Sequence, residues 1–467
     1  MRTREGISFR YTVLIGALVM VGATHGQTTL IPDAAFEQAL VNDGIDSNGM
    51  TGDILNSDAQ AVWYLDVDSS GISDLTGLEA FTYLVTLSAN VNNITTADFS
   101  PHQYLWGAYL YENQLTSIDL SQNAELHQLW VHTNQLATLD ITNNPLLFEV
   151  LADNNQLTSI DLLNNDSLKV LRLNNNALST IDLSANDSLR QLSISDNQLD
   201  DLAIGNLTDL RTLFCNDNAL TTLDVSQNTE LRVLYCSDNP LGQLDLSTNF
   251  SLETLGCSNT GLSQLEVGHI DLVHLICDDN QLTELDINRP SLNQLICHDN
   301  LIEELDLSAT SIWRECLVYD NQLHTLNFQN GLNAFMITAG LGYFNSTGNP
   351  DLGCVMVDDV ALAQANFQVD PWTGFSLDCA VGMEENSEPE LTIFPNPATD
   401  RVTIAAVGMD VAQAVLTDAS GARIRSLDLS QGRTSFSVSS LNAGMYFLEL
   451  KGKEGRVLRE RIVLQGP

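Results

Sequence analysis

Apolar and polar positions recur along the chain with a period of 20 to 22 residues. Between Ser88 and Asn321 the pattern apolar-x-x-apolar-x-apolar-x-x-Asn-x-Leu returns twelve times, as in the run from Leu126 to Leu136. A fixed period of this length indicates stacked units, none of which buries its apolar side alone. We call the recurrent asparagine the ladder position. It holds Asn92, Asn113, Asn134, Asn155, Asn176, Asn197, Asn218, Asn239, Asn280, Asn300 and Asn321, with Thr260 as the substitute.

The first half of each unit alternates in a way that predicts a strand. The residues five and three places before the ladder position share one face, and the residue between them lies on the other. The second half, as in Thr116 to Leu120, predicts a short extended segment instead of a helix. The ladder asparagines offer a donor and an acceptor to neighbouring coils, so we expect them to be structural.

These columns resemble the leucine-rich repeat. The run from Leu210 to Leu220 fits that family's pattern, with Cys215 in place of its sixth-position leucine. The resemblance implies a curved solenoid with a parallel sheet on its concave face. We therefore expect an α/β solenoid dominated by β structure, with about 12 coils, a cap at each end and a small C-terminal antiparallel β-sandwich.

An acidic column runs through the second halves of the units. A solvated, self-repelling face is one interpretation, and cation binding between coils is another that the spacing leaves open. The column consists of Asp119, Asp140, Asp161, Asp182, Asp224, Asp245, Asp286 and Asp306, with Glu266 in one coil.

The net charge and the N-terminal segment indicate which partners and which cellular location to expect. The 19 basic and 60 acidic residues give a formal net charge of −41, which disfavours nucleic acid as a partner. Arg2, Arg4 and Arg10 precede an apolar run from Val13 to Ala23, which predicts a secretory signal cleaved after Ala23 or Gly26. That run is shorter than the ~20 residues a membrane span requires, so we expect no span.

The segment after the signal predicts an N-terminal cap. Asp33 is placed to cap a short helix on which Phe36 and Leu40 share a face. The acidic and amide residues that follow are similar to a calcium loop, but the spacing and the closing glutamate of an EF-hand are missing, so we expect no metal there. They are Asp43, Asp46, Asn48 and Asp53.

The eight cysteines fall into two classes. Six of them occupy inward positions, and we expect buried free thiols there, because side chains in register on parallel strands fit disulfide geometry poorly. These six are Cys215, Cys236, Cys257, Cys277, Cys297 and Cys316. Cys354 and Cys379 lie beyond the last repeat, and we expect them to form a disulfide that closes the C-terminal cap.

The repeat pattern does not continue into the C-terminal segment. Short alternating segments separated by turns predict the β-sandwich. Three blocks resemble the C-terminal sorting domain of type IX secretion cargo: Ile393 to Pro397 followed by Val402 to Ile404, then Gly444 to Leu448, then Lys451 to Leu464. The motif residues are Pro395, Asn396, Pro397, Gly444 and Tyr446. The resemblance implies contact with the type IX machinery, passage across the outer membrane, removal of the tail, and anchoring or release.

We expect six segments along the chain. They are a signal peptide (1–26), an N-terminal cap with an irregular first coil (27–80), the repeats (81–331), a C-terminal cap (332–380), an acidic linker (381–390) and the sorting domain (391–467).

Aromatic side chains on the outward strand positions mark the candidate site. One patch gathers around Tyr109, Tyr111 and Trp130, and a second around Phe214 and Tyr235. Contiguous aromatics favour ligand binding, although β-propensity and cross-strand contact are an alternative explanation. We place His132 and Arg172 in the same surface. A basic row, Lys169, Arg190, Arg211 and Arg232, is expected to pair with the acidic residues Asp196, Asp217 and Asp238 or to meet an anionic partner.

The functional expectation is a non-enzymatic, monomeric recognition module, secreted or displayed on the cell surface, that binds a protein or glycan on the concave face. No catalytic motif occurs among the scattered histidines and glycines, and we expect no cofactor. The alternatives are a structural or scaffolding envelope protein and a signalling adaptor, the latter supported only by analogy of fold.

Overall fold

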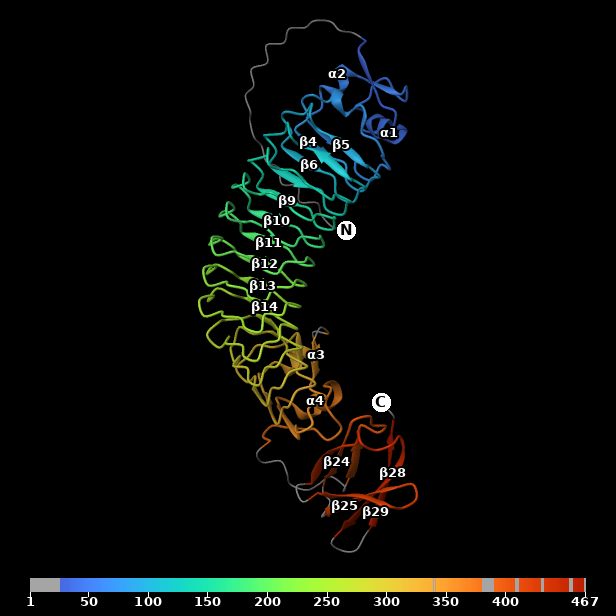
Figure 1. Ribbon diagram of the computed structural model, residues 1–467, viewed down its shortest axis with the longest axis vertical. Helices are drawn as coiled ribbons and strands as arrows, with labels where there is room; N and C mark the ends of the chain where they lie inside the picture. Colours follow the sequence, from blue (N-terminus) through green and yellow to red (C-terminus); the bar gives the residue numbers. More distant parts are fainter. Residues whose placement is uncertain are drawn as a thin grey trace.

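The computed structural model describes residues 26–338, 340, 342–379, 390–407, 411–429, 432–452 and 457–465. The predicted signal, apart from Gly26, and nearly all of the predicted linker lie outside the described residues. The chain winds coil after coil into an elongated, curved body, and a second β region follows at its C-terminal end (Figure 1). The leucine-rich-repeat solenoid predicted from the period is confirmed.

One short strand from each coil builds a single parallel sheet of 14 strands. The register follows the repeat, since Leu171 pairs with Leu192, 21 residues later. In spatial order the strands are β3 (Tyr64–Asp66), β4 (Thr86–Ser88), β6 (Gly107–Tyr109), β8 (Gln128–Trp130), β9 (Glu149–Leu151), β10 (Val170–Arg172), β11 (Gln191–Ser193), β12 (Thr212–Phe214), β13 (Val233–Tyr235), β14 (Thr254–Gly256), β15 (His274–Ile276), β16 (Gln294–Ile296), β18 (Glu315–Leu317) and β20 (Tyr343–Asn345).

The sheet extends one coil beyond the predicted repeats at each end. At the N-terminal end Ser70 occupies the place of the ladder asparagine, after Ser69 with a φ of 54°. At the C-terminal end the ladder residue is Asn349, whose Nδ2 donates to Val318 O at 3.0 Å. The last coil is lengthened by helix α3 (Asn333–Thr338), which displaces its asparagine from the regular period.

The ladder asparagines bond adjacent coils, as predicted. Asn134 Nδ2 donates to Leu110 O at 2.9 Å and to Val131 O at 3.0 Å, while its Oδ1 accepts from Leu115 N at 2.8 Å. One carboxamide thus satisfies backbone groups of two coils where the chain leaves the strand. The bond to the preceding coil spans 24 residues for Asn134 and 23 for Asn280 and Asn300, where the repeat is one residue shorter, so the ladder follows the stacking register of the coils.

A second asparagine ladder, which the sequence analysis missed, lies in the turn that leads back to the sheet. Asn144 is fully buried, and its Nδ2 donates to Leu120 O at 3.0 Å and to Asn123 O at 2.8 Å. Six coils repeat this contact with carbonyls of the preceding coil. The residues are Asn123, Asn144, Asn165, Asn186, Asn228 and Asn249.

The residue before each ladder position has a left-handed backbone. Asp196, Asp217 and Asp238 have φ values of 55°, 52° and 56°, and asparagine or aspartate holds this place in nine coils from Asn154 to Asp320. These two residue types tolerate the left-handed region best among non-glycine residues. Backbone geometry therefore accounts for the acidity of this column.

The second halves of the units are extended, and at the two ends of the solenoid they pair as strands. These are β5 (Thr96–Asp98) with β7 (Ser117–Asp119), and β17 (Glu304–Asp306), β19 (Thr325–Phe328), β21 (Cys354–Val357) and β22 (Gly374–Ser376) in order. The acidic column stabilises the following turn, because Asp119 Oδ1 accepts from Ser121 N at 2.9 Å and Asp140 Oδ1 from Thr142 N at 3.0 Å. The hydrogen bond from the Ser121 backbone is the largest cause of the lowered pKa of Asp119.

The apolar columns form one continuous core along the solenoid. The six cysteines predicted as free thiols are free and buried within it. Burial raises the pKa of each thiol, that of Cys236 to about 12, so all six are protonated at neutral pH. They pack as small apolar side chains.

Both caps seal the ends of this core. At the N-terminus Asp33 caps α1 (Ala34–Asn42), and Phe36 and Leu40 are fully buried, as predicted. The rest of this cap comprises β1 (Thr28–Leu30) paired with β2 (Asp53–Leu55), α2 (Asn56–Ala59) and the 3-10 turn η1 (Leu78–Ala80). At the C-terminus, α3 and α4 (Val360–Asn366) cover the last coils, and the predicted disulfide between Cys354 and Cys379 is present.

The C-terminal region is antiparallel, in two sheets around a second apolar core. One sheet holds β23 (Glu390–Phe394), β24 (Arg401–Val407) and β27 (Arg433–Ser437), and the other holds β25 (Val411–Asp418), β26 (Arg423–Asp428), β28 (Gly444–Gly452) and β29 (Val457–Leu464). Asn396 ties the motif to the last strand, since its Oδ1 accepts from Val463 N and its Nδ2 donates to Arg461 O, both at 2.8 Å. Tyr446 donates to Asn442 O at 3.0 Å.

Candidate functional site: the outward face of the parallel sheet

The alternation of each strand decides which side chains reach the surface of the sheet. In β8 the central Leu129 is fully buried, whereas Gln128 and Trp130 on either side are partly exposed. The same pattern repeats in most strands. One surface is therefore formed by the first and third residues of each strand and by the residue two places after the third. We call this surface the sheet face.

The first predicted aromatic patch is assembled on the sheet face. The rings of Tyr109 and Trp130, from neighbouring strands, have centroids 4.5 Å apart. Beside them Tyr111 and His132 stack face to face at 4.6 Å with 6° between their planes. Tyr109 also donates to Gln128 Oε1 at 2.7 Å. Four rings are therefore held side by side with their edges partly open to solvent.

The polar groups of this patch are neutral at physiological pH. Burial, with the nearby charge of Glu149, raises the pKa of Tyr109 to about 12. Burial likewise lowers the pKa of His132 below its usual 6.5. The patch thus presents apolar ring surface with uncharged hydrogen-bonding groups, a combination suited to recognition.

Arg172 extends the patch by two strands. Its Nε lies 3.1 Å from Oδ2 of Asp153, which is 3% exposed. Burial raises the pKa of Asp153, with the Arg172 charge and the Asn174 backbone opposing that shift. Arg172 therefore offers a cation on the sheet face that a buried carboxylate holds in place.

The second predicted patch is a separate one. Phe214 and Tyr235 stack with centroids 5.3 Å apart and 14° between their planes. Ser193 on β11 lies between them and Arg172, so the two patches predicted from the sequence are two separate surfaces. Gly256 on the next strand accommodates the tyrosine ring, because a Cβ there would lie 2.4 Å from Tyr235 Cδ1.

Exposed aromatics beside the sheet were missed in the sequence. Seven places before the ladder position, Trp106 and His127 stack at 5.3 Å, and Phe148 meets them edge-on. Tyr83 and Tyr104, nine places before it, stack at 6.4 Å and are 52% and 56% exposed. These two columns could have been found from the repeat alignment, because they keep the same register as the strand positions.

The basic row continues the column of Trp106, His127 and Phe148. Lys169, Arg190, Arg211 and Arg232 are exposed in the next four coils. Arg232 pairs with Glu253 of the following coil at 2.8 Å. The expected pairing with Asp196, Asp217 and Asp238 does not occur among these described residues, because the two columns lie at opposite ends of the strands. Burial raises the pKa of Asp217, and the negative charges of Asp238 and Asp196 raise it further.

Near the C-terminal end of the sheet face lies a third group, also missed. His298 stacks on Tyr319 at 4.2 Å, and its Nδ1 lies 2.8 Å from Asp299. Possible ligand atoms of Asp278, Asp279 and His298 all lie within 4.8 Å of one another. Asp278 and His298 hold equivalent places in successive coils, so the repeat register indicates that they are neighbours, although they were not singled out as a group in the sequence analysis.

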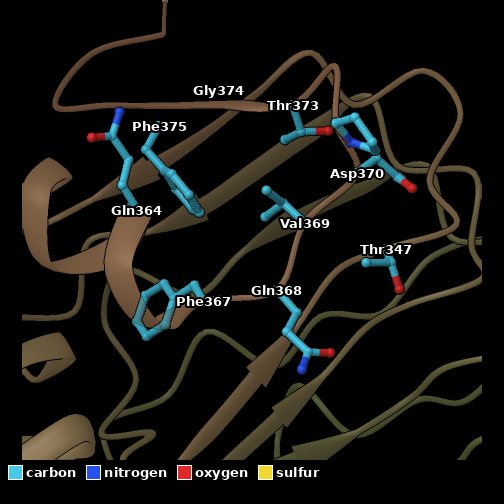
Figure 2. Close-up of a pocket in the computed structure, with 10 residues that line it drawn as sticks. Thr347, Gln364, Phe367, Gln368, Val369, Asp370, Thr373, Gly374 and Phe375 are labelled. Carbon is cyan, nitrogen blue, oxygen red and sulfur yellow. The ribbon is translucent and has the colours of Figure 1, made fainter. Parts of the chain in front are cut away.

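Two pockets in the described part of the chain lie at its C-terminal cap, away from the aromatic patches. One of about 520 Å³ is lined by the end of α4 and the loop after it, from Gln364 to Phe375, with Thr347 (Figure 2). Its single ionisable residue, Asp370, accepts from Asn349 N at 3.0 Å. A second, of about 590 Å³, lies beside the Cys354–Cys379 disulfide. The first pocket therefore contains no pair of groups for acid–base chemistry.

Comparison with known proteins agrees with the two parts of the fold. Residues 392–465 match the family model of the secretion system C-terminal sorting domain. No curated protein sequence matches the chain. The helices in the described part of the chain all lack the length and apolar character that crossing a membrane would require.

Among solved structures, the chain is similar to the functional domain of InlJ from Listeria monocytogenes, which includes a cysteine ladder. The identity is 23%, the match covers 94% of this chain and 99% of that one, and the TM-score is 0.54. An internalin, inlF, from the same species is 19% identical over 73% of this chain and 92% of its own, with a TM-score of 0.51. A leucine-rich-repeat protein of Leptospira interrogans is 19% identical over 69% and 97%, also with 0.51.

These findings define the class of protein. The chain is a leucine-rich-repeat solenoid that carries a C-terminal secretion sorting domain. The sorting domain indicates export by the type IX route, across the outer membrane to the cell surface or the extracellular space.

Proposed function

We propose that the exported solenoid is a non-enzymatic recognition module that binds a protein or glycan on the sheet face, on the concave side of the solenoid. The observation that carries this proposal is the patch of four rings, Tyr109 with Trp130 and Tyr111 with His132. Each ring is held by its neighbour in the next coil, so little conformational entropy remains to be lost on binding.

The composition of the sheet face supports binding. Tyrosine, tryptophan and arginine are the residues that most often dominate the energetics of interfaces. Here Tyr109, Trp130 and Arg172 lie within four successive strands, and the exposed rings of Tyr104 and Trp106 widen the surface on one side. Isolated exposed aromatics would need no such explanation, but a contiguous surface marks an interaction site.

The test is a binding screen with the mature protein against arrayed glycans and immobilised extracellular proteins. A variant carrying Tyr109→Ser, Trp130→Ser, Phe214→Ser and Tyr235→Ser should lose the interaction that the wild-type protein shows. Undiminished attachment of this variant, with its fold intact by circular dichroism, would favour a structural or scaffolding role in the envelope instead.

A further inference from the structure

The loop from Asp46 to Asp53 gathers buried oxygen acceptors in the N-terminal cap. Asp46 is 4% exposed, and its Oδ1 accepts from Asn48 N at 3.2 Å. Its Oδ2 is buried and has no hydrogen-bond partner. The Oδ1 of Asn48 is likewise buried without a partner, although its Nδ2 donates to Asp53 Oδ1 at 2.9 Å. Two acceptor oxygens, two residues apart, are thus left unsatisfied.

A second carboxylate binds the same loop. Glu37, on α1, is also 4% exposed and accepts from the backbone of Gly52. The negative charges of Glu37 and Asp58 both act on Asp46. Asp58 Oδ2 in turn accepts from Ser47 N at 3.1 Å. Carboxylates therefore surround the loop on both sides, and two of them are removed from water.

The described N-terminal cap and first coils supply no compensating positive charge to this loop. Residues 26–101 contain 11 acidic side chains and no lysine, arginine or histidine. Buried carboxylates need a counter-charge, because leaving a charge unpaired in the interior is strongly unfavourable. That counter-charge must come from solution, as a proton or as a metal ion.

Contrary to the expectation from the sequence spacing, we propose that Ca²⁺ binds at this loop, with Asp46, Asn48 and Glu37 as side-chain ligands. The donor set consists of oxygens alone, since residues 26–101 contain neither histidine nor cysteine, and hard oxygen ligands in an irregular loop suit Ca²⁺ better than Zn²⁺ or Mg²⁺. The ion ties α1 to the loop before β2, and so holds the cap on the first coil. Extracellular calcium modules of this kind bind at roughly 0.1–1 mM.

Hydrogen exchange of the mature protein measures this site directly. In 10 mM CaCl₂, relative to EDTA, the amides of residues 45–55 should exchange about tenfold more slowly, as expected for a dissociation constant near 1 mM. Asp46→Asn should abolish the response and, because it removes a buried charge, should slow exchange in EDTA. Asp43→Asn, which alters an exposed carboxylate in the same segment, should respond like the wild type.

Three results would overturn the proposal. The first is a wild-type protein whose exchange in this loop is unchanged by 10 mM CaCl₂. The second is protection that appears in EDTA on acidification to pH 5 and is not increased by Ca²⁺, which would identify a proton as the counter-charge. The third is an equal response to MgCl₂ and CaCl₂, which would reject the assignment to calcium.

Discussion

Tyr111 and His132 lie flat against each other, 21 residues apart in sequence and 4.6 Å apart between ring centroids. Their strands, β6 and β8, are neighbours in the parallel sheet, so the contact depends on the register of the coils. His132 is partly buried in this stack. The same two rings therefore report on the stacking of the solenoid and on the chemistry of the proposed binding surface.

The first prediction concerns the protonation of His132. Because burial lowers its pKa below 6.5, an NMR titration of the ring protons should show a midpoint below that value. The contribution of this group to stability is present above pH 6.5 and is lost as the pH falls through the lowered pKa. Tyr111→Ala should move the midpoint back toward 6.5.

Tyr319→Ala is the matched control, since it removes a similar stack on His298 many coils away. It should leave the titration of His132 unchanged. A midpoint for His132 at or above 6.5 in the wild-type protein would mean that the ring is not buried by Tyr111.

The second prediction concerns the ladder. Asn134→Ala leaves the Leu110 and Val131 carbonyls and the Leu115 amide without their partner, and should lower the free energy of unfolding by about 1–3 kcal/mol. Gln135→Ala changes an exposed amide in the next position and should cost less than about 0.5 kcal/mol. Urea denaturation of both variants measures the difference, and equal stabilities would refute the structural role of the ladder.

The third prediction concerns the cysteines. The six buried thiols should resist alkylation by iodoacetamide in the folded protein at pH 8, because burial raises their pKa values and excludes the reagent. Unfolding in urea without reductant should give six labels by mass spectrometry, and unfolding with reductant eight. Eight labels without reductant would contradict the Cys354–Cys379 disulfide.

The fourth prediction concerns Asp153 and Arg172. Arg172→Met removes the cation beside a buried carboxylate and should cost about 1–3 kcal/mol at pH 7, less than for a fully buried pair because the arginine is 43% exposed. Without the arginine the folded-state pKa of Asp153 rises further above its usual 3.8. The free energy of unfolding of the variant, relative to that of the wild-type protein, should therefore be highest below pH 3.8. It should decrease as the pH rises through the raised pKa of Asp153.

Asp153→Asn in the Arg172→Met background separates charge from packing. It should restore most of the lost stability and remove the pH dependence. A double variant as unstable as the single one would attribute the cost to the lost arginine side chain alone.

The periodic part of the fold could be predicted because every residue in a column meets the same physical requirement, so the same residue type recurs there. The ladder asparagines bond two coils and the inward cysteines fill a uniform core, so both classes are visible as columns in the sequence. The disulfide could be predicted from the position of Cys354 and Cys379 beyond the last repeat. The aromatic contacts followed from the same register, since Tyr109 and Trp130 occupy equivalent places.

The features that the sequence did not predict lie in the irregular coils at the two ends of the solenoid and in columns outside the strand positions. Ser70 replaces the asparagine of the first coil, and α3 shifts Asn349 away from the period, so both end coils were assigned to the caps. The exposed rings of Tyr104 and Trp106, by contrast, lie just before the strand in the same repeat register and could have been predicted from it. The acidic residues before the ladder position were interpreted from the sequence as charged partners for the basic row. The left-handed backbone at positions such as Asp217 explains why aspartate occurs there.

The binding affinity of the mature protein for the partner found in the array screen tests the central claim most directly. Trp130→Ser should weaken the affinity at least about thirtyfold, as expected for an interface hot spot of 2 kcal/mol or more. Phe250→Ser removes a ring that is 65% exposed in the turn before β14, outside the sheet face, and should change the affinity less than about twofold. Equal affinities for Trp130→Ser and the wild-type protein would contradict recognition on the sheet face.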